Sequence, residues 1–295
     1  MSFFRCDCNV HKAKIRPPTK LEKLSDRMAT RVGADLLSGI RRFKKRVSQE
    51  ALEKAIKSGS LGHIIKEIPW ESGAEDILPS FKKLDESFER SGMISLEALP
   101  APLHKNLRVD LKNPKLKKFI GDRFNTFMLD LNTETAQMVQ RAIQRSFSHA
   151  KTPREVAQSI VKHIGLNDRQ SEALINYQMG LEMKNLAPDK IEKLTTGYEE
   201  RLLRQRSTMI ARTEIQNANN QGQLAVWKQA QDEGLLNVDE TFKVWENDRT
   251  PCPKCKKMHG KKVKLNEKWH LDDGRAVEVP SEIHPNCYCF QTLEF

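Results

Sequence analysis

The stretch TPREVAQSIVKHIG at residues 152–165 predicts a helix with a marked start and a marked end. Thr152 suits the N-cap, Pro153 suits the first helical position, and Glu155 can bond back to the cap, which together make a capping box. Gly165 suits the position just after the last turn. The apolar residues between them recur on one helical face: Val156, Ala157, Ile160, Val161 and Ile164.

Helical patterns continue on both sides of this stretch. A second helix is expected from near Asn167 through Tyr177, and a long helix over about residues 196–233. Apolar residues spaced three and four apart predict helix over roughly 20–58, from Leu21 to Ile40 and beyond. Residues 59–115 are punctuated by Gly, Ser and Pro and are expected to be a boundary region. The two helices joined at Gly165 leave a DNA-reading helix-turn-helix open beside plain hairpin packing.

The register of the long helix groups its polar residues. One side collects Ile210, Glu214, Asn217, Ala218 and Gln221, and another collects Arg212, Gln216 and Asn219 or Asn220. If the first side is buried, Glu214 must be hydrogen-bonded or ion-paired, because an unpaired buried carboxylate is costly. An exposed polar stripe is the alternative that the sequence leaves open.

After Gly234 the pattern changes to short β-like runs at residues 241–245, 261–265, 275–279 and 288–293. The predicted fold is therefore mainly α, with helical N-terminal and central regions and a small β-rich C-terminal module. We expect four regions along the chain. They are an extended basic arm at 1–20, an N-terminal helical region at 21–125, a central helical domain at 126–234 and the Cys/His module at 235–295.

Two Cys/His half-sites lie in this module. Cys252 and Cys255 form a C-x2-C pair, and His284, Cys287 and Cys289 follow about thirty residues later. Zinc takes four ligands tetrahedrally, and two cysteines three apart across a tight turn can face one ion. We expect Cys252, Cys255 and Cys287 as ligands, with Cys289 or His284 as the fourth, and cysteines that merely pack are the alternative. A closed four-ligand site is structural rather than catalytic.

The remaining Cys and His residues give weaker signals. His259 and His270 lie between the half-sites, and Cys6-Asp7-Cys8 with His11 forms a half-site on the arm. No secretory leader is apparent, because Arg5 follows Phe3-Phe4 at once. In a reducing cytoplasm, six cysteines in close-spaced pairs indicate metal ligands before disulfides.

The net charge of +11 is concentrated near the start of the chain, where residues 1–55 hold 14 basic against 6 acidic side chains. A positive field favours polyanions, and non-specific contact with double-stranded DNA is expected. Solvated helix faces are the alternative for each basic run. The candidate DNA-contacting residues are Arg41, Arg42, Lys44, Lys45 and Arg46, with a second cluster at Lys105, Arg108, Lys112, Lys115, Lys117, Lys118 and Arg123.

Catalytic and membrane signatures are scarce. The sequence contains no HExxH, no GxSxG, no Gly-rich phosphate loop and no apolar stretch long enough to cross a bilayer. The nearest enzyme alternative is a zinc-stapled nuclease of the His-Asn-His type around His270, to which Asp272 and Asp273 contribute only loosely. We therefore expect a non-catalytic protein.

Three separated motifs together resemble a known family. They are Ile210-Ala211-Arg212-Thr213-Glu214-Ile215 with Asn219 and Gly222, the stretch from Trp245 through Asp248 to Cys255 with Gly260, and His284-Pro285-Asn286-Cys287-Tyr288-Cys289. The chain is similar over roughly residues 130–295 to the minor head, or head morphogenesis, proteins of tailed bacteriophages, such as phage Mu protein F. Tyr288 departs from the Arg that the family usually carries there.

The resemblance implies a virion component inside the capsid near the portal, made in the host cytoplasm during assembly. It implies portal, capsid and scaffold proteins and packaged DNA as partners, and a role in head assembly and in DNA packaging or ejection. The resemblance also marks Arg212, Thr213, Glu214 and Asp248 as structural motif residues. We expect the long helix to dock the module through Glu214 or Arg212.

Overall fold

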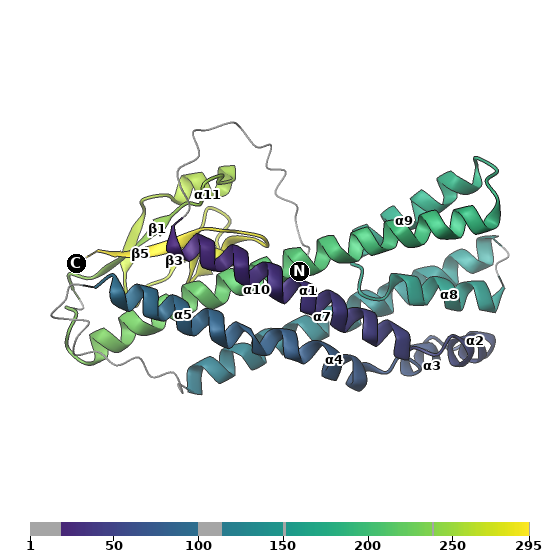
Figure 1. Ribbon diagram of the computed structural model, residues 1–295, viewed down its shortest axis with the longest axis horizontal. Helices are drawn as coiled ribbons and strands as arrows, with labels where there is room; N and C mark the ends of the chain where they lie inside the picture. Colours follow the sequence, from purple (N-terminus) through teal and green to yellow (C-terminus); the bar gives the residue numbers. More distant parts are fainter. Residues whose placement is uncertain (1–18, 100–113, 150–151, 238, 295) are drawn as a thin grey trace. The chain divides into compact units, whose positions relative to one another are not determined.

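The computed structural model describes residues 19–99, 114–149, 152–237 and 239–294 (Figure 1). The mainly helical fold with a small C-terminal β module is confirmed. The helices preceding the module are α1 (Lys20–Arg46), α2 (Gln49–Lys57), α3 (Leu61–Lys66), α4 (Trp70–Lys82), α5 (Leu84–Glu97), α7 (Pro114–His149), α8 (Pro153–His163), α9 (Asp168–Glu182) and α10 (Pro188–Asp232). The arm residues Cys6, Cys8 and His11 lie outside the described residues.

The chain forms two compact units, each assembled from separated segments. Unit 1 takes residues 1–33, 82–120 and 208–295, and unit 2 takes residues 34–81 and 121–207. The chain passes from unit 1 to unit 2 between Ile120 and Gly121, near the boundary predicted at 125 but inside α7, which runs from Pro114 to His149. The helical part does end close to the boundary predicted at 234, since α10 ends at Asp232 and β1 begins at Phe242.

The stretch 152–165 in unit 2 folds as its sequence predicts. Thr152 N donates to Glu155 Oε2 at 2.7 Å, and Glu155 N donates to Thr152 Oγ1 at 3.3 Å, so the capping box is formed. Gly165 ends the helix with φ +86°, a conformation that favours glycine. In α9, Gln170 Nε2 donates to the Leu202 carbonyl of α10 at 3.1 Å. That use of Gln170 favours ordinary hairpin packing over a DNA-reading helix.

The sequence pattern over 20–115 was partly misleading. The predicted helix at 20–58 is interrupted at Ser48, whose Oγ caps the start of α2. The predicted boundary region at 59–115 is largely helical, since α3, α4 and α5 lie within residues 61–97, and the chain passes from unit 2 to unit 1 inside it, between Phe81 and Lys82. Two of its glycines, Gly73 and Gly92, lie in tight helix packing rather than in loops. A Cβ on Gly73 would lie 2.7 Å from the Phe43 ring, and one on Gly92 would lie 3.0 Å from Val226.

The C-terminal module belongs to unit 1 and is a small antiparallel arrangement. A three-stranded sheet has the order β2-β1-β5, and a separate two-stranded ribbon pairs β3 with β4. The strands are β1 (Phe242–Glu246), β2 (Lys262–Lys264), β3 (Trp269–His270), β4 (Ala276–Val277) and β5 (Phe290–Glu294), joined by α11 (Pro253–Met258) and the 3-10 helix η1 (Pro280–Ile283). All four predicted runs contain a strand, while β3 and both helices were not predicted.

Trp245 and Trp269 centre the core of this module. Both indoles are almost fully buried, and their rings meet edge to face with centroids 5.3 Å apart. The buried cysteines pack in the same cluster, together with Met258, Val277 and Ile283. The Cys/His half-sites are therefore part of the apolar core.

The middle of α10 is buried on more than one side. Glu214 is 7% exposed and Ala218 is fully buried on the side grouped first by the sequence, while Gln216 and Asn220 on the other side are 4% and 0% exposed. The exposed polar stripe is therefore wrong and the buried alternative holds. A helix surrounded in this way must find hydrogen-bond partners for its amides.

Candidate metal centre

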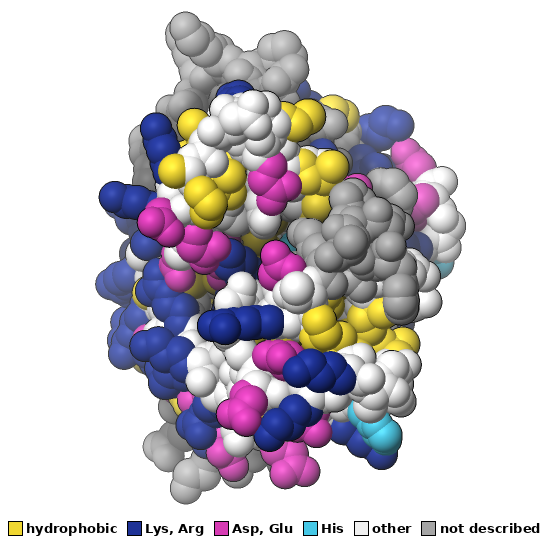
Figure 2. All heavy atoms as spheres, turned by 90° about the vertical axis from the view of Figure 1, so that its right-hand side faces the viewer, with side chains coloured by type: hydrophobic (Ala, Val, Ile, Leu, Met, Phe, Trp, Pro, Cys, Tyr) yellow, Lys and Arg dark blue, Asp and Glu magenta, His cyan; other side chains and the backbone are white. Residues whose placement is uncertain are grey.

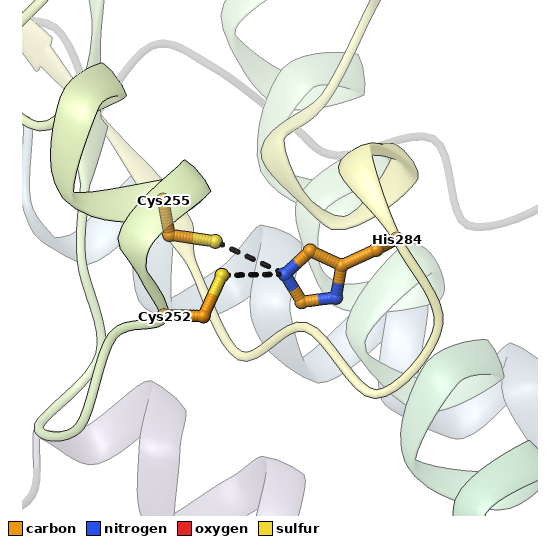
Figure 3. Close-up of side chains that lie close together, drawn as sticks. All are labelled: Cys252, Cys255 and His284. Atoms are coloured by element: carbon orange, nitrogen blue, oxygen red, sulfur yellow. Dashed lines mark hydrogen bonds between the residues drawn. The ribbon is translucent and has the colours of Figure 1, made fainter. Parts of the chain in front are cut away.

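Cys252 and Cys255 flank the start of α11, and His284 follows η1 (Figure 3). Pro253 begins α11, so Cys252 is its N-cap residue and Cys255 lies in its first turn. Both thiols point toward the imidazole, with Cys252 Sγ and Cys255 Sγ each 3.2 Å from His284 Nε2. Residues from both half-sites, Cys252 and Cys255 from the first and His284 from the second, therefore form one group of donors.

The backbone sets the orientation of the His284 ring. His284 Nδ1 lies 2.8 Å from the carbonyl oxygen of its neighbour Pro285. A carbonyl only accepts, so Nδ1 carries the proton and donates it there. Nε2 is then the ring nitrogen that faces the two thiols and the one that a metal ion would take.

Cys287 and Cys289 complete a second group that shares Cys255 with the first. Cys255 Sγ lies 3.8 Å from Cys287 Sγ, and the Cys289 backbone N–H donates to Cys287 Sγ at 3.4 Å. Within each group, Cys252–Cys255–His284 and Cys255–Cys287–Cys289, the donor atoms lie within 4.8 Å of one another. The five predicted metal-site residues are therefore brought together around Cys255.

The donor set fits zinc. Thiolate sulfur binds zinc at about 2.3 Å and imidazole nitrogen at about 2.0–2.1 Å, so tetrahedral ligands lie roughly 3.5–3.8 Å apart. The 3.8 Å Cys255–Cys287 separation matches that spacing, and the 3.2 Å Cys–His separations are slightly shorter. All four thiols are at most 4% exposed. A buried set with more donors than zinc needs is suited to a structural role.

The pKa values of the four neighbouring thiols shift in opposite directions. The hydrogen bond from Cys255, with help from His284, lowers the pKa of Cys252 to about 4, and hydrogen bonds from Cys255 and Cys287 lower that of Cys289 to about 3. Those same hydrogen bonds raise the pKa of Cys255, and burial raises that of Cys287. Four buried thiolates repel one another, so full ionisation of this set requires a cation.

The helix α10 contacts the segment that carries the second half-site. The Asn286 backbone N–H donates to Thr213 Oγ1 at 2.9 Å, where Asn286 adopts φ +60°. The Arg212 guanidinium lies over the Tyr288 ring, 5.6 Å from its centroid. Two of the predicted motif residues thus lie against residues 286–288, and Thr213 accepts the hydrogen bond from the backbone. Glu214 is buried on the same helix.

Asp248, the fourth motif residue, lies in the loop between β1 and α11. Its Oδ1 accepts from the Thr250 backbone N–H at 2.9 Å. Burial, with the nearby Cys289 thiolate, raises the pKa of the Asp248 carboxyl to about 6. The neighbouring Arg249 pairs with Asp26 of α1 at 3.4 Å. The loop that leads into Cys252 is therefore stabilised by its own Asp248–Thr250 hydrogen bond and by the ion pair of Arg249 with α1.

Sequence reasoning missed the amides that join α10 to β5. Gln216 Nε2 and Asn220 Nδ2 each donate to the Cys289 carbonyl at 3.0 Å. Further along, Gln223 Nε2 donates to the Gln291 carbonyl at 3.1 Å, and Gln291 Nε2 donates back to the Asn220 carbonyl at 2.9 Å. The amide-rich run QNANNQGQ at 216–223 was the available signal.

The amide run also reaches the two helices that pack beside it in unit 1. Ser25 Oγ of α1 donates to Gln216 Oε1 at 2.9 Å and accepts from Asn219 Nδ2 at 2.6 Å. Ser87 Oγ of α5 donates to Asn219 Oδ1 at 2.8 Å. One buried hydrogen-bond chain therefore links α1, α5, α10 and the carbonyl of a candidate metal ligand.

The other histidines lie apart from this centre. His259 Nδ1 accepts from the Asn247 N–H at 3.4 Å, and His270 is exposed on β3. The carboxylates beside His270 are paired, Asp272 with Lys257 at 3.3 Å and Asp273 with Arg275 at 2.9 Å. In the part of the chain that the structure describes, His270 therefore has no metal-binding set beside it of the kind that a His-Asn-His nuclease needs.

The predicted DNA-contacting residues of α1 face acidic partners within unit 2. Arg41 pairs with Glu200 and Lys44 pairs with Glu199, while Arg42 and Arg46 share Asp76 at 3.0 and 2.7 Å. Lys45 is exposed. On the face drawn in Figure 2, basic side chains likewise lie among acidic ones. From the second cluster, Lys105, Arg108 and Lys112 lie outside the described residues.

Comparison with known proteins identifies the family. A family model described as "Phage Mu protein F like protein" matches residues 137–292, which is more than half of the chain. No curated protein and no solved structure matches the chain. None of the described helices has the length and apolar character that a bilayer crossing requires. The matched range contains α10 from its start together with both Cys/His half-sites, and the chain therefore belongs to the Phage Mu protein F like family of phage head morphogenesis proteins.

Proposed function

We propose that this protein is a non-catalytic minor capsid protein that acts inside the procapsid near the portal. It assists head assembly and the packaging or ejection of DNA. The observation that carries the proposal is the meeting of the family's motifs in unit 1, where Thr213 of α10 accepts a hydrogen bond from the backbone of Asn286, between His284 and Cys287 of the second half-site. The motifs thus serve to hold one docked module together.

A structural zinc ion would complete this module. Cys252, Cys255 and Cys287 would hold it, with Cys289 or His284 as the fourth ligand. When bound, the ion supplies a cross-link between the α11 turn and the segment after η1. The protein's own groups, Gln216 and Asn220 on the Cys289 carbonyl and Pro285 on the His284 ring, orient the donors around it.

The module's role in this proposal is to present a rigid surface to portal, capsid or scaffold proteins. The sheet and the ribbon of the module are both small, since β2 has three residues and β3 and β4 have two each. Sheets of that size are marginal without another source of stability. Loss of the metal should therefore release the module from α10 and abolish assembly contacts while the rest of the chain stays folded.

The test is incorporation into procapsids. The protein is co-expressed with the portal, major capsid and scaffolding proteins of the same phage genome, and its copies per purified procapsid are counted by quantitative mass spectrometry. A Cys252→Ser/Cys287→Ser variant and a Thr213→Val variant should be depleted. The exposed substitution Lys66→Ala is the matched control. Equal incorporation of all variants would remove the proposal.

Non-specific contact with DNA stays a separate prediction. The charges of Arg41, Arg42, Lys44 and Arg46 are compensated within the fold. The support is the excess that remains in residues 1–55 without these four, ten basic against six acidic side chains. Binding should weaken steeply between about 50 and 200 mM salt, without cutting of plasmid in Mg²⁺. Nicking that disappears on changing His270 would instead support the nuclease alternative.

A further inference from the structure

Helix α5 and the first half of α1, both in unit 1, run antiparallel and border an open groove. Lys20 of α1 pairs with Glu97 of α5 at 3.7 Å, and Arg31 pairs with Glu86 at 3.2 Å. The later residue of α1 thus pairs with the earlier residue of α5, so the two helices run antiparallel. Between these two ion pairs lies a groove of about 380 Å³, outside the metal module. Its lining includes Lys23, Leu24, Arg27, Arg90, Met93 and Ile94.

The floor of the groove is apolar. Leu24 is buried and Ile94 is half-buried, whereas Met93 is 50% exposed. Met93 is one of the few large apolar side chains exposed to that extent among the described residues. Methionine adapts its shape to a partner surface and is common where helices are bound.

The rim of the groove is basic. Lys20, Lys23, Arg27 and Arg90 line it against a single acidic residue, Glu97. Arg90 pairs with Glu86 at 2.8 Å, and that carboxylate also serves Arg31. Within the described chain, no acidic group is paired with Lys23 or Arg27, and both are exposed. The groove therefore presents uncompensated positive charge beside apolar surface.

We propose that this groove binds an acidic amphipathic helix of another protein. A third helix can pack in the groove between two antiparallel helices, with its apolar face on Met93 and Ile94. Carboxylates on the flanks of that helix would then face Lys23 and Arg27. Apolar contact supplies affinity, and the charges supply selectivity and a faster association.

The neighbouring segments of this chain have the wrong charge for the groove. Residues 1–18 carry four basic side chains and one acidic one, and residues 100–113 carry three and one. Both would bring like charge to a basic rim. DNA is also negatively charged, but its phosphates would gain nothing from contact with the apolar floor. The effect of Met93 on affinity therefore distinguishes an amphipathic helix from DNA.

The test uses the full chain and two labelled helical peptides of about 20 residues. Both carry leucines on one face; the remaining positions are Glu and Ala in one peptide and Lys and Ala in the other. Fluorescence anisotropy should show binding of the acidic peptide only. Lys23→Glu/Arg27→Glu and, separately, Met93→Asp should each raise its Kd at least about tenfold. The control Lys66→Glu/Lys82→Glu changes two exposed lysines that do not line the groove and should leave the Kd unchanged.

Circular dichroism melting of each variant verifies that unit 1 stays folded, and three results would overturn the proposal. The first is equal binding of both peptides, or acidic-peptide binding that neither groove variant weakens. The second is tighter binding of a peptide of residues 1–18, lost in Met93→Asp, which would assign the groove to this chain's own arm. The third is competition by duplex DNA whose own binding responds to Lys23→Glu/Arg27→Glu but not to Met93→Asp.

Discussion

Gln216 donates a hydrogen bond from Nε2 to the backbone carbonyl of Cys289, 3.0 Å away and 73 residues later in the chain. Asn220, one helical turn further along α10, donates to the same oxygen at the same distance. Both lone pairs of this carbonyl oxygen accept a hydrogen bond, so its hydrogen-bonding capacity is satisfied. The two bonds fix the position of the residue before β5 along α10. The position of Cys289 relative to Cys255 follows from these contacts.

Replacing Gln216 with Leu should lower the free energy of unfolding by about 1–3 kcal/mol. The change removes one donor to Cys289 and leaves Ser25 without its acceptor, and both groups are buried. Urea unfolding followed by Trp fluorescence measures the loss. Gln205→Leu, on the exposed side of the same helix, should be close to neutral. Equal effects of the two substitutions would contradict the role given to Gln216.

Removal of the metal should unfold the module selectively. We expect about one zinc per chain in protein purified under reducing, chelator-free conditions. Individual Ser variants at Cys252, Cys255, Cys287 and Cys289, and His284→Ala, should separate ligands from the spare donor, because only a true ligand lowers zinc affinity by orders of magnitude. Elemental mass spectrometry with competition by a chelator measures this. Full-length protein free of metal, with its module folded, would show that the donors only pack.

Gly222→Ala should destabilise unit 1 by about 3 kcal/mol or more. A Cβ at this position would lie 2.2 Å from the Phe88 carbonyl oxygen and 2.3 Å from Ser91 Oγ, so α5 and α10 would have to separate. Gly197→Ala on the same helix has open space and should stabilise by up to about 1 kcal/mol. Thermal melts of the two variants compare them directly, and similar melting temperatures would count against this close approach.

Lys44→Met should cost unit 2 about 3–5 kcal/mol. The substitution strands Glu199, a carboxylate that is 7% exposed and whose pKa burial already raises. The double variant Lys44→Met/Glu199→Leu should recover most of that loss, because both charges are then absent from the interior. A double-mutant cycle on unfolding free energies gives the coupling. Additive losses would mean that the pair is not coupled.

Asp76 should make unit 2 sensitive to acid. Burial opposes its ionisation, but hydrogen bonds from Arg46 and Arg42 outweigh burial and lower the pKa of the carboxyl. A lowered pKa contributes stability above the unfolded value of about 3.9, and this contribution is lost as pH falls through the folded value. Asp76→Asn should reduce stability at neutral pH and flatten its fall below about pH 4. An unchanged acid limb would assign the sensitivity to other carboxyls.

The local signals of the sequence were reliable where their partners are a few residues away. The Thr152–Glu155 capping box and the helix after Asn167 depend on contacts three residues apart, and both are formed. Gly73 and Gly92 misled for the opposite reason, because their partners are distant in the sequence. Loops and close helix contacts both select small side chains, and only the neighbour across the contact, such as Phe43 beside Gly73, separates the two.

By itself, the sequence determined the helical class, the change to short strands after Gly234, the Cys/His spacing and the family motifs. Each of these features depends on the periodicity of side chains or on spacings of a few residues. Only the tertiary structure decided that Cys255 is shared by both donor groups and that Thr213, Gln216 and Asn220 support them. Those contacts join residues about seventy positions apart through backbone groups. A backbone carbonyl has the same chemistry at every residue, so no side-chain pattern reveals which one an amide will reach.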